Sequence, residues 1–246
     1  MKKIYSIIIL ALFLVAGQVI AQKQLYFGAG GTGISSWLIN QNNYGYQDLD
    51  LKAGISYGFN ANAGFDFTNN LGVKLELGFQ KLGQKYSKTK GDTSFTRNIG
   101  LNYFQLPVLL KFRTGGKTVK FMAAIGPQFD FLLNAKQDYY YTLMDTIGEY
   151  DYTKPIPGTT ELISENDITH RFNSFDIQAR LDLGIEIIII KNLFIDASLS
   201  FAYGLKDIIA PDYQYEDRDG NYNPVHNAYV GFNVGINYCL DFSKGK

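Results

Sequence analysis

The residues that could support hydrolytic chemistry are few. His170 and His226 are the only histidines, and Ser174 and Asp167 lie near His170 in the sequence. A serine, a histidine and an acid that converge in space could activate the serine for acyl transfer or hydrolysis. Neighbouring positions in a sequence do not supply that convergence. We therefore predict no catalytic residues and a protein that is not an enzyme.

Metal-binding chemistry is equally sparse. The two histidines and the single cysteine, Cys239, do not have the spacing of a recognised ligand cluster. Segment 217–221 (Asp-Arg-Asp-Gly-Asn) is similar to a calcium loop, but its glycine comes too early for an EF-hand, and Asp-Gly is a common turn signal. We interpret it as a turn, with calcium binding as the alternative, and expect neither a metal nor a cofactor.

Tyrosines gather in two long segments, 134–172 and 206–226. Tyrosine offers a broad contact area at a low cost in conformational entropy, so such segments could form binding surfaces. They could equally fold over the rest of the protein as a lid. The candidate surface-binding residues are Tyr139, Tyr140, Tyr141, Tyr150, Tyr152, Tyr213, Tyr215 and Tyr222.

The elements that must position these residues are strands. In residues 227–242, apolar side chains from Ala228 to Phe242 alternate with small or polar ones. This period of two is typical of a strand whose two faces meet different surroundings. Similar alternation appears in segments 24–36, 51–67, 71–80, 99–113, 118–131, 175–187 and 193–205, which gives eight strands.

The connections between these strands are alternately long and short. We predict long loops at 37–50, 86–98, 134–172 and 206–226, with short turns around Asn69-Asn70, Gly115-Gly116 and Lys191-Asn192. Barrels of the bacterial outer membrane show this asymmetry, with short turns in the periplasm and long loops outside the cell. The predicted fold is therefore all-β, an eight-stranded antiparallel up-and-down transmembrane β-barrel.

The N-terminus has the pattern of a secretory signal. Lys2 and Lys3 precede an apolar run from Ile4 to Ala16, and the residues before Ala21 are mostly small or β-branched. We predict a signal peptide at 1–21 and a barrel domain at 22–246, exported to the outer membrane with both termini in the periplasm. A membrane anchor is the competing interpretation, but the run is short against the roughly 20 apolar residues of a spanning helix.

Charge and cysteine content limit the partners. The chain has 23 basic and 23 acidic residues, and residues 1–21 contain two lysines and no acid. A nearly neutral chain lacks the clustered basic surface that nucleic acid requires. We expect outer-membrane lipid and envelope proteins as partners and no nucleic acid, with the oligomeric state left open. One cysteine cannot form an internal disulfide.

Strand parity also places charged residues inside the barrel. An eight-stranded barrel is just wide enough for side chains to fill it, so we expect these charges to pair across the lumen rather than line a pore. A pore for small solutes is the alternative. The predicted interior residues are Lys52, Asp66, Lys74, Glu76, Lys111, Lys120, Asp130, Asp176, Arg180, Asp182, Glu186 and Asp196.

One stretch resembles a known family. Residues 102–112 (NYFQLPVLLKF), followed by 123–127 (AAIGP), are similar to the PorT-like outer-membrane β-barrel family, most strongly over 99–133. The resemblance implies an outer-membrane barrel and, for the namesake protein, a part in the type IX secretion and gliding apparatus. Pro107 and Pro127 cannot donate ladder hydrogen bonds, so we expect a bulge or a local break beside them.

Together these patterns predict an integral outer-membrane barrel that is not an enzyme. We expect it to act in surface binding or as an envelope scaffold, and the family resemblance adds a link to protein secretion. The runner-up is a narrow channel for solutes or lipids. A lipid-modifying barrel enzyme is the third hypothesis.

Overall fold

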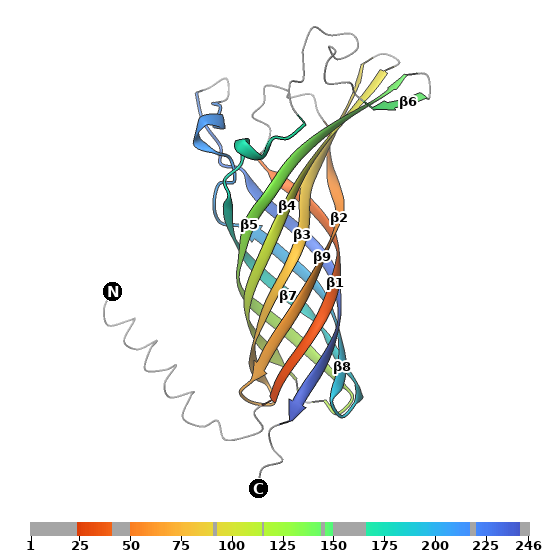
Figure 1. Ribbon diagram of the computed structural model, residues 1–246, viewed down its shortest axis with the longest axis vertical. Coiled ribbons are helices and arrows are strands. Elements are labelled where there is room, and N and C mark those ends of the chain that lie inside the picture. The colour runs from red at the N-terminus through yellow and green to blue at the C-terminus, as the bar shows by residue number, and fades with distance from the viewer. Residues whose placement is uncertain are drawn as a thin grey trace, which may run out of the picture.

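A computed structural model describes residues 24–40, 50–90, 93–114, 116–143, 146–149, 166–216 and 220–241. Eight long strands form a closed antiparallel barrel (Figure 1). This confirms the predicted fold. The barrel strands are β1 (Gln24–Ile39), β2 (Asp50–Asp66), β3 (Leu71–Lys90), β4 (Thr93–Arg113), β5 (Val119–Leu143), β7 (Phe175–Ile190), β8 (Leu193–Gly204) and β9 (His226–Asp241).

Each barrel strand pairs with its neighbours in the chain, and β1 pairs with β9 to close the wall. Among the described residues, the remaining strand, β6 (Thr146–Glu149), pairs only with the last residues of β5. The first half of β5 pairs with β7. Closure leaves no free edge in the eight-stranded part, which is what a lipid environment requires of a sheet.

The two ends of the barrel differ. At one end, which we call the turn end, Gln24 pairs with Asp241 and the links 67–70, 114–118 and 191–192 join successive strands. The opposite end, the loop end, carries the long connections between β1 and β2, between β5 and β7 and between β8 and β9, whereas β3 and β4 stay paired to within two residues of each other in the chain. There β3, β4 and β5 continue as a sheet that stands above the rest of the wall (Figure 1). We call residues 87–90, 93–97, 139–143 and 146–149 the projecting sheet.

This sheet corrects two predicted loop boundaries. Segment 86–98 is not a loop, because β3 and β4 stay paired from Tyr86 with Arg97 up to Lys90 with Thr93. The predicted loop at 134–172 begins too early, since β5 runs to Leu143. The sequences of these strand ends are mostly polar, so the alternation that identifies a half-apolar strand is missing from them.

A β-bulge in β5 explains why the alternation of apolar and polar residues was seen only over 118–131. Asn102 pairs with Asn134, but Tyr103 pairs with Leu132, which leaves Leu133 as an extra residue on β5. Buried positions accordingly change from even to odd numbers along the strand, from Asp130 to Ala135. A one-residue shift exchanges the two faces of a strand.

The prolines break the ladder locally without changing its register. Pairing of β4 with β5 skips from Pro107 and Gln128 to Leu110 and Ile125, and the sums of the paired numbers stay equal. The prediction of a local break near Pro107 is confirmed. Pro127 keeps its pairing with Ala179 on β7.

The outer wall of the barrel is apolar. Ile55 is 91% exposed and Phe121 is 67% exposed, far from the usual burial of such residues in a water-soluble protein. Ten positions after Phe121 on β5, the ring of Phe131 contacts those of Phe104 and Phe175. At a rise of about 3.4 Å per residue and a tilt of about 45°, the step from Phe121 to Phe131 spans about 24 Å, close to the apolar band of outer-membrane barrels.

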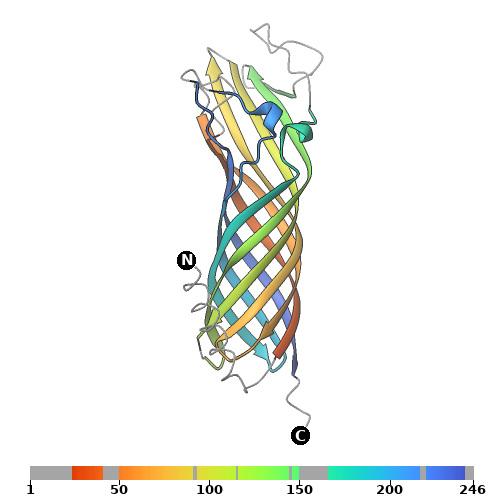
Figure 2. The same cartoon turned by 90° about the vertical axis from the view of Figure 1, so that its left-hand side faces the viewer.

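Helical structure is minor in the described ranges. Two short 3-10 helices, η1 (Thr169–Arg171) and η2 (Pro211–Tyr213), lie at the loop end (Figure 2). Among the described residues, no helix has the length and apolar character needed to cross a membrane.

Candidate functional site in the barrel interior and at its loop end

A square of charges occupies the lumen at the turn end. Lys111 on β4 lies 3.0 Å from Glu186 and 3.4 Å from Asp66, measured between charged atoms. Arg113 lies 2.7 Å from Asp66 and 3.1 Å from Glu186. All four side chains are buried, and the four contacts tie β2, β4 and β7 together. Arg113 also donates from Nε to Asn69 O at 2.9 Å, which anchors the turn between β2 and β3.

An aromatic ring lies against this square. The Lys111 ammonium is 4.1 Å from the centre of the Tyr26 ring, within the range of a cation–π contact. The ring lies across Gly64 on the neighbouring strand, where an added Cβ would be 1.9 Å from Tyr26 Cζ. Glycine at this position is therefore what admits the ring.

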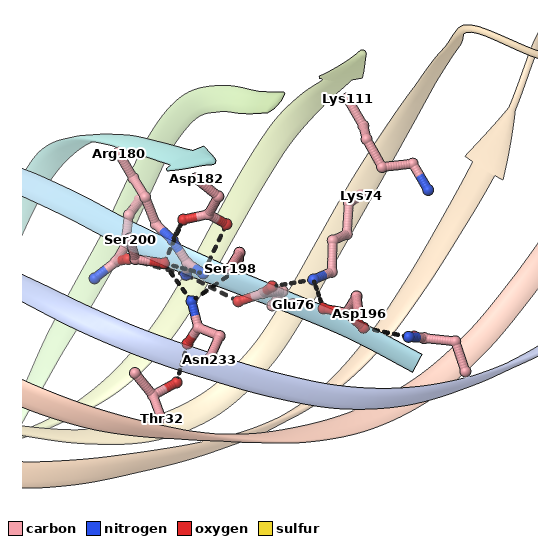
Figure 3. A network of polar contacts seen from close by, with 12 residues as sticks. Thr32, Lys74, Glu76, Lys111, Arg180, Asp182, Asp196, Ser198, Ser200 and Asn233 are labelled. Atoms are coloured by element: carbon pink, nitrogen blue, oxygen red, sulfur yellow. Dashed lines mark hydrogen bonds and ion pairs between the residues drawn. The ribbon is translucent and has the colours of Figure 1, made fainter. Parts of the chain in front are cut away.

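The middle of the lumen holds a second ion network (Figure 3). Glu76 on β3 lies 2.8 Å from both Lys74 Nζ and Arg180 Nη1. Arg180 also makes a two-point contact with Asp182, at 2.8 and 3.0 Å. Lys74 reaches Asp196 on β8 at 3.7 Å. Each carboxylate in this network therefore has a cationic partner.

Hydroxyl and amide groups from β1, β8 and β9 complete the network (Figure 3). Ser200 donates to Asp182, and Asn233 donates to Ser200 and accepts from Thr32. Asn237 donates to Asp196. Buried charges are tolerated in a protein interior when they are paired and hydrogen-bonded, and most of these groups meet that condition.

Nearer the loop end, the lumen contains two more carboxylates, Asp130 on β5 and Asp176 on β7. They are register partners, and the Nε2 group of Gln178 contacts both, at 2.6 and 3.3 Å. Gln128 Nε2 lies 3.0 Å from each oxygen of Asp130, and Asn227 Nδ2 donates to Asp176 at 2.8 Å. These donors are neutral amides.

An apolar core closes the loop end of the lumen. It combines inward-facing residues of the strands with residues from the two long connections. We call the connecting part the plug, which consists of residues 166–174, 205–213 and Val225. Its buried apolar members are Ile168, Phe172, Ile208, Ile209 and Val225, which pack against Ile34, Leu38, Leu82, Tyr86, Ile99, Leu101, Tyr103, Ala135, Ala202 and Tyr229.

Backbone hydrogen bonds fix the plug to the wall and its halves to each other. Ile168 N donates to Ala135 O at 2.9 Å, and Asn173 N donates to Ile208 O at 2.8 Å. A bridge joins Phe172 and Ile209. The two connections are thereby held as one unit in the mouth of the barrel.

Asp207 organises the second connection. Its Oδ1 accepts from the backbone N–H groups of Ile209 and Val225, at 3.0 and 3.1 Å. Its Oδ2 accepts from Tyr222 Oη at 2.6 Å and from Gln214 Nε2 at 2.9 Å. One carboxylate thus satisfies donors from both ends of a long loop.

The residues considered for hydrolysis have separate structural contacts. Asp167 accepts from the backbone N–H and the hydroxyl of Thr169, at 2.9 and 2.6 Å, and these two bonds lower the pKa of its carboxyl. The His170 ring packs edge-on against Tyr213. His226 stacks on Tyr203, and its Nδ1 lies 3.2 Å from Lys206 O.

The tyrosines of the predicted binding surface divide into three groups. Tyr139, Tyr140 and Tyr141 lie on β5 in the projecting sheet, not in a loop. Tyr213 and Tyr222 pack at the plug, and Tyr215 is exposed. Tyr150 and Tyr152 lie outside the described residues, as do residues 217–219 of the calcium-like segment.

Most of the predicted interior charges are confirmed. Ten of the twelve are buried, while Lys52 is exposed and Lys120 is half-buried near the turn end. Arg113 was missed, although it has the same parity as Lys111 and stands at the end of β4. Within the described ranges, no group of three or more His, Cys, Asp or Glu side chains could hold a metal ion.

Comparison with solved structures found barrels of low sequence identity. Neisserial surface protein A is 10% identical, with 86% of this chain and 96% of that chain covered and a TM-score of 0.39. OprG from Pseudomonas aeruginosa is 11% identical, with coverages of 90% and 97% and a TM-score of 0.40. Ail, the attachment invasion locus protein of Yersinia pestis, is 12% identical, with coverages of 89% and 98% and a TM-score of 0.34.

A search of curated proteins gave no match. The model of the family described as "Outer membrane protein beta-barrel domain" matches residues 21–210, most of the chain. That match agrees with the closed eight-stranded barrel and its apolar outer wall. The chain belongs to the outer membrane protein beta-barrel domain family.

Proposed function

We propose that this protein is a non-conducting, non-enzymatic barrel that binds other molecules at the cell surface through its projecting sheet. The observation that carries the proposal is the filled interior. Charged side chains fill the lumen from the turn end to its middle, apolar side chains fill it at the loop end, and both sets are buried. A lumen filled by side chains in this way supports a role at the surfaces of the barrel rather than conduction through it.

The proposal places the turn end in the periplasm and the loop end outside the cell. Outer-membrane barrels have short periplasmic turns and longer external loops, and this chain has the same asymmetry. Residues 1–21 would direct export and be removed. Sequencing the N-terminus of the protein from an outer-membrane fraction should give Gln22 as the first residue, and a chain that still begins at Met1 would contradict cleavage.

The projecting sheet has the features of a rigid binding surface. The half-buried Arg97 guanidinium lies 5.6 Å from the centre of the half-buried Tyr139 ring and 5.9 Å from that of Tyr86, which belongs to the buried apolar core beneath it. Arg97 Nη2 also donates to Gln137 Oε1 at 2.8 Å. Arginine and tyrosine held in fixed geometry are the residue types that dominate protein interfaces, because little conformational entropy is lost when they bind.

A native-detergent purification tests surface binding. The tagged protein is isolated from outer membranes, washed with salt, and its co-purifying proteins are identified. We expect bound proteins that are lost from the Tyr139→Ala/Tyr140→Ala double variant and kept by Tyr238→Ala, which changes a tyrosine on the outward face near the turn end. Identical partners in both variants, or a barrel recovered alone, would count against the projecting sheet.

Conductance in planar bilayers tests the closed lumen. We expect no steady openings from the intact chain, because ion passage would require the paired side chains of the lumen and the plug to move apart together. Regular single-channel openings would favour the runner-up function, a narrow channel for solutes or lipids.

A second candidate function is that of a scaffold in a protein secretion machine. It is supported by the resemblance of residues 99–133 to the PorT-like family and by nothing else in the chain. Deleting the gene should then abolish export of secreted proteins while leaving the outer membrane intact. Normal secretion in the deletion strain would dispose of this candidate and leave surface binding in place.

A further inference from the structure

Asp130 and Asp176 are the two buried carboxylates whose charge has no cationic partner among the described residues. Seven acidic and four basic side chains are buried in the barrel. The other five acids all form ion pairs, and those pairs engage all four buried bases. They are Asp66, Glu76, Asp182, Glu186 and Asp196 with Lys74, Lys111, Arg113 and Arg180.

The groups in hydrogen-bond contact with the two carboxylates carry no positive charge, and Arg180 near Asp130 and His226 near Asp176 act on them only from a longer distance. Gln128, Gln178 and Asn227 donate side-chain N–H groups to them, and all three are fully buried. Two facing carboxylates repel each other strongly where water cannot screen them. Neutral amides reduce this repulsion without cancelling it.

The same place is rich in oxygen atoms that lack donors. Gln178 Oε1, Asn227 Oδ1 and Asp176 Oδ1 are buried and accept no hydrogen bond from the described part of the chain. The amide nitrogens of Gln178 and Asn227 contact the carboxylates, and the oxygens of the same two amides are the atoms left without a donor. Gln105, the register partner of Asp130, adds a fourth buried oxygen without a donor.

We propose that Asp130, Asp176, Gln178 and Asn227 form a binding site for a calcium ion. Hard divalent cations take carboxylate and amide oxygens as ligands, and calcium tolerates six to eight of them in irregular geometry. A half-turn of either amide exchanges its nitrogen for its oxygen without moving the backbone. Two positive charges would neutralise the pair of carboxylates that the protein's own bases leave unpaired.

The position of the site gives the ion a structural role. Asn227 comes two residues after Val225 of the plug and also donates to Tyr103 Oη at 3.1 Å, and Tyr103 belongs to the apolar core. A calcium ion here would join β5, β7 and the start of β9 directly beneath the plug. It would thereby hold the connection 205–225 in the mouth. This site is independent of the surface binding proposed above.

The test uses the full chain refolded into detergent with either calcium chloride or EGTA. After dialysis, bound calcium is measured by atomic absorption. The melting temperature is taken as the temperature at which half of the protein changes from the gel mobility of the folded barrel to that of the unfolded chain. We expect stoichiometric calcium and a higher melting temperature in the calcium sample. Asp130→Asn and Asp176→Asn should each lose both effects.

Asp196→Asn is the matched control, because Asp196 is a buried carboxylate of the same lumen that already pairs with Lys74. It should keep the bound calcium and the calcium-dependent rise in melting temperature. Asn227→Leu keeps both carboxylates and removes one oxygen ligand, so it should weaken calcium binding even if the carboxylate variants fail to fold.

Three results would overturn the proposal. One is an intact chain that binds no calcium and melts at the same temperature in calcium and EGTA. Another is equal binding by Asp176→Asn and Asp196→Asn. The third is a melting temperature that varies with pH in EGTA and does not change when calcium is added. That result would indicate that the two carboxylates share a proton instead of a calcium ion.

Discussion

Arg180 Nη1 on β7 lies 2.8 Å from Glu76 Oε2 on β3, although β4 and β5 separate these strands around the wall. The contact therefore crosses the lumen instead of following the sheet. It links opposite walls of the barrel at a depth where both side chains are buried. This ion pair therefore ties two sides of the barrel together through its interior.

Replacing Glu76 with glutamine should destabilise the barrel by about 3–5 kcal/mol, because it leaves Arg180 and Lys74 with fewer negative partners in a buried site. Urea-dependent unfolding in detergent, followed by tryptophan fluorescence, would measure the change. Lys52→Gln is the control, since Lys52 is exposed, and it should change the free energy of unfolding by less than about 0.5 kcal/mol. Equal effects would show that the network adds little.

An arginine placed on the outer wall should be costly at mid-height and tolerated near the rim. Ile125 faces outward between the two aromatic groups of β5, so Ile125→Arg should cost about 2–4 kcal/mol in lipid vesicles. Leu133 faces outward beyond Phe131, and Leu133→Arg should cost about 0–1 kcal/mol. Folding equilibria in vesicles would measure both costs. Similar costs would contradict a membrane whose midplane lies near Ile125.

Truncating Phe172 should loosen the plug. The side chain is buried in the apolar core, and its loss should cost about 3–5 kcal/mol of local stability. Hydrogen exchange of the Ile208 and Asn173 amides should speed up in Phe172→Ala. Tyr215→Ala, at an exposed residue of the connection between β8 and β9, should leave exchange unchanged.

Asp207→Ala should release the connection between β8 and β9. Four donors lose their acceptor, two of them backbone N–H groups, and each unsatisfied buried donor costs about 1–3 kcal/mol. Limited proteolysis of intact cells or detergent-solubilised protein should cut between 205 and 225 faster than in the unmodified chain. Asp207→Asn retains acceptor oxygens and should show a smaller increase, and identical cleavage in all three proteins would refute this role.

The turn at Asp167 should weaken in acid. Hydrogen bonds from the Thr169 side chain and backbone hold the pKa of the Asp167 carboxyl below its ordinary value. A lowered pKa in the folded state means that the stabilisation is present above the ordinary value of about 3.9 and is lost as the pH falls through the folded pKa. Carbon-detected NMR of labelled aspartate should show this titration, and Thr169→Val should return the pKa toward normal.

Much of the barrel was visible in the sequence. Alternation in 51–67, 175–187 and 227–242 identified the outward and inward faces, because each strand there has lipid on one side and a polar lumen on the other. Ten buried charges followed from that parity alone. The long and short connections indicated an up-and-down barrel, since only antiparallel neighbours can be joined by tight turns.

The sequence was misleading where that difference between the faces disappears. The sequence of 86–98 is mostly polar and does not alternate between apolar and polar residues, so it looked like a loop. The bulge at Leu133 reversed the parity of β5 and hid its last ten residues. Arg113 was overlooked at the end of β4, although its parity and its two partners, Asp66 and Glu186, are those of Lys111.

By itself, then, the sequence determined the eight barrel strands and the face that most of their side chains take within the apolar band, because these depend on a period of two along the chain. Only the tertiary structure decided which charges meet across the lumen, how two long connections combine into one plug, and that Asp130 and Asp176 face each other without a base. Those relationships depend on closure of the barrel and on the register of every strand pair, which bring together residues far apart in the chain.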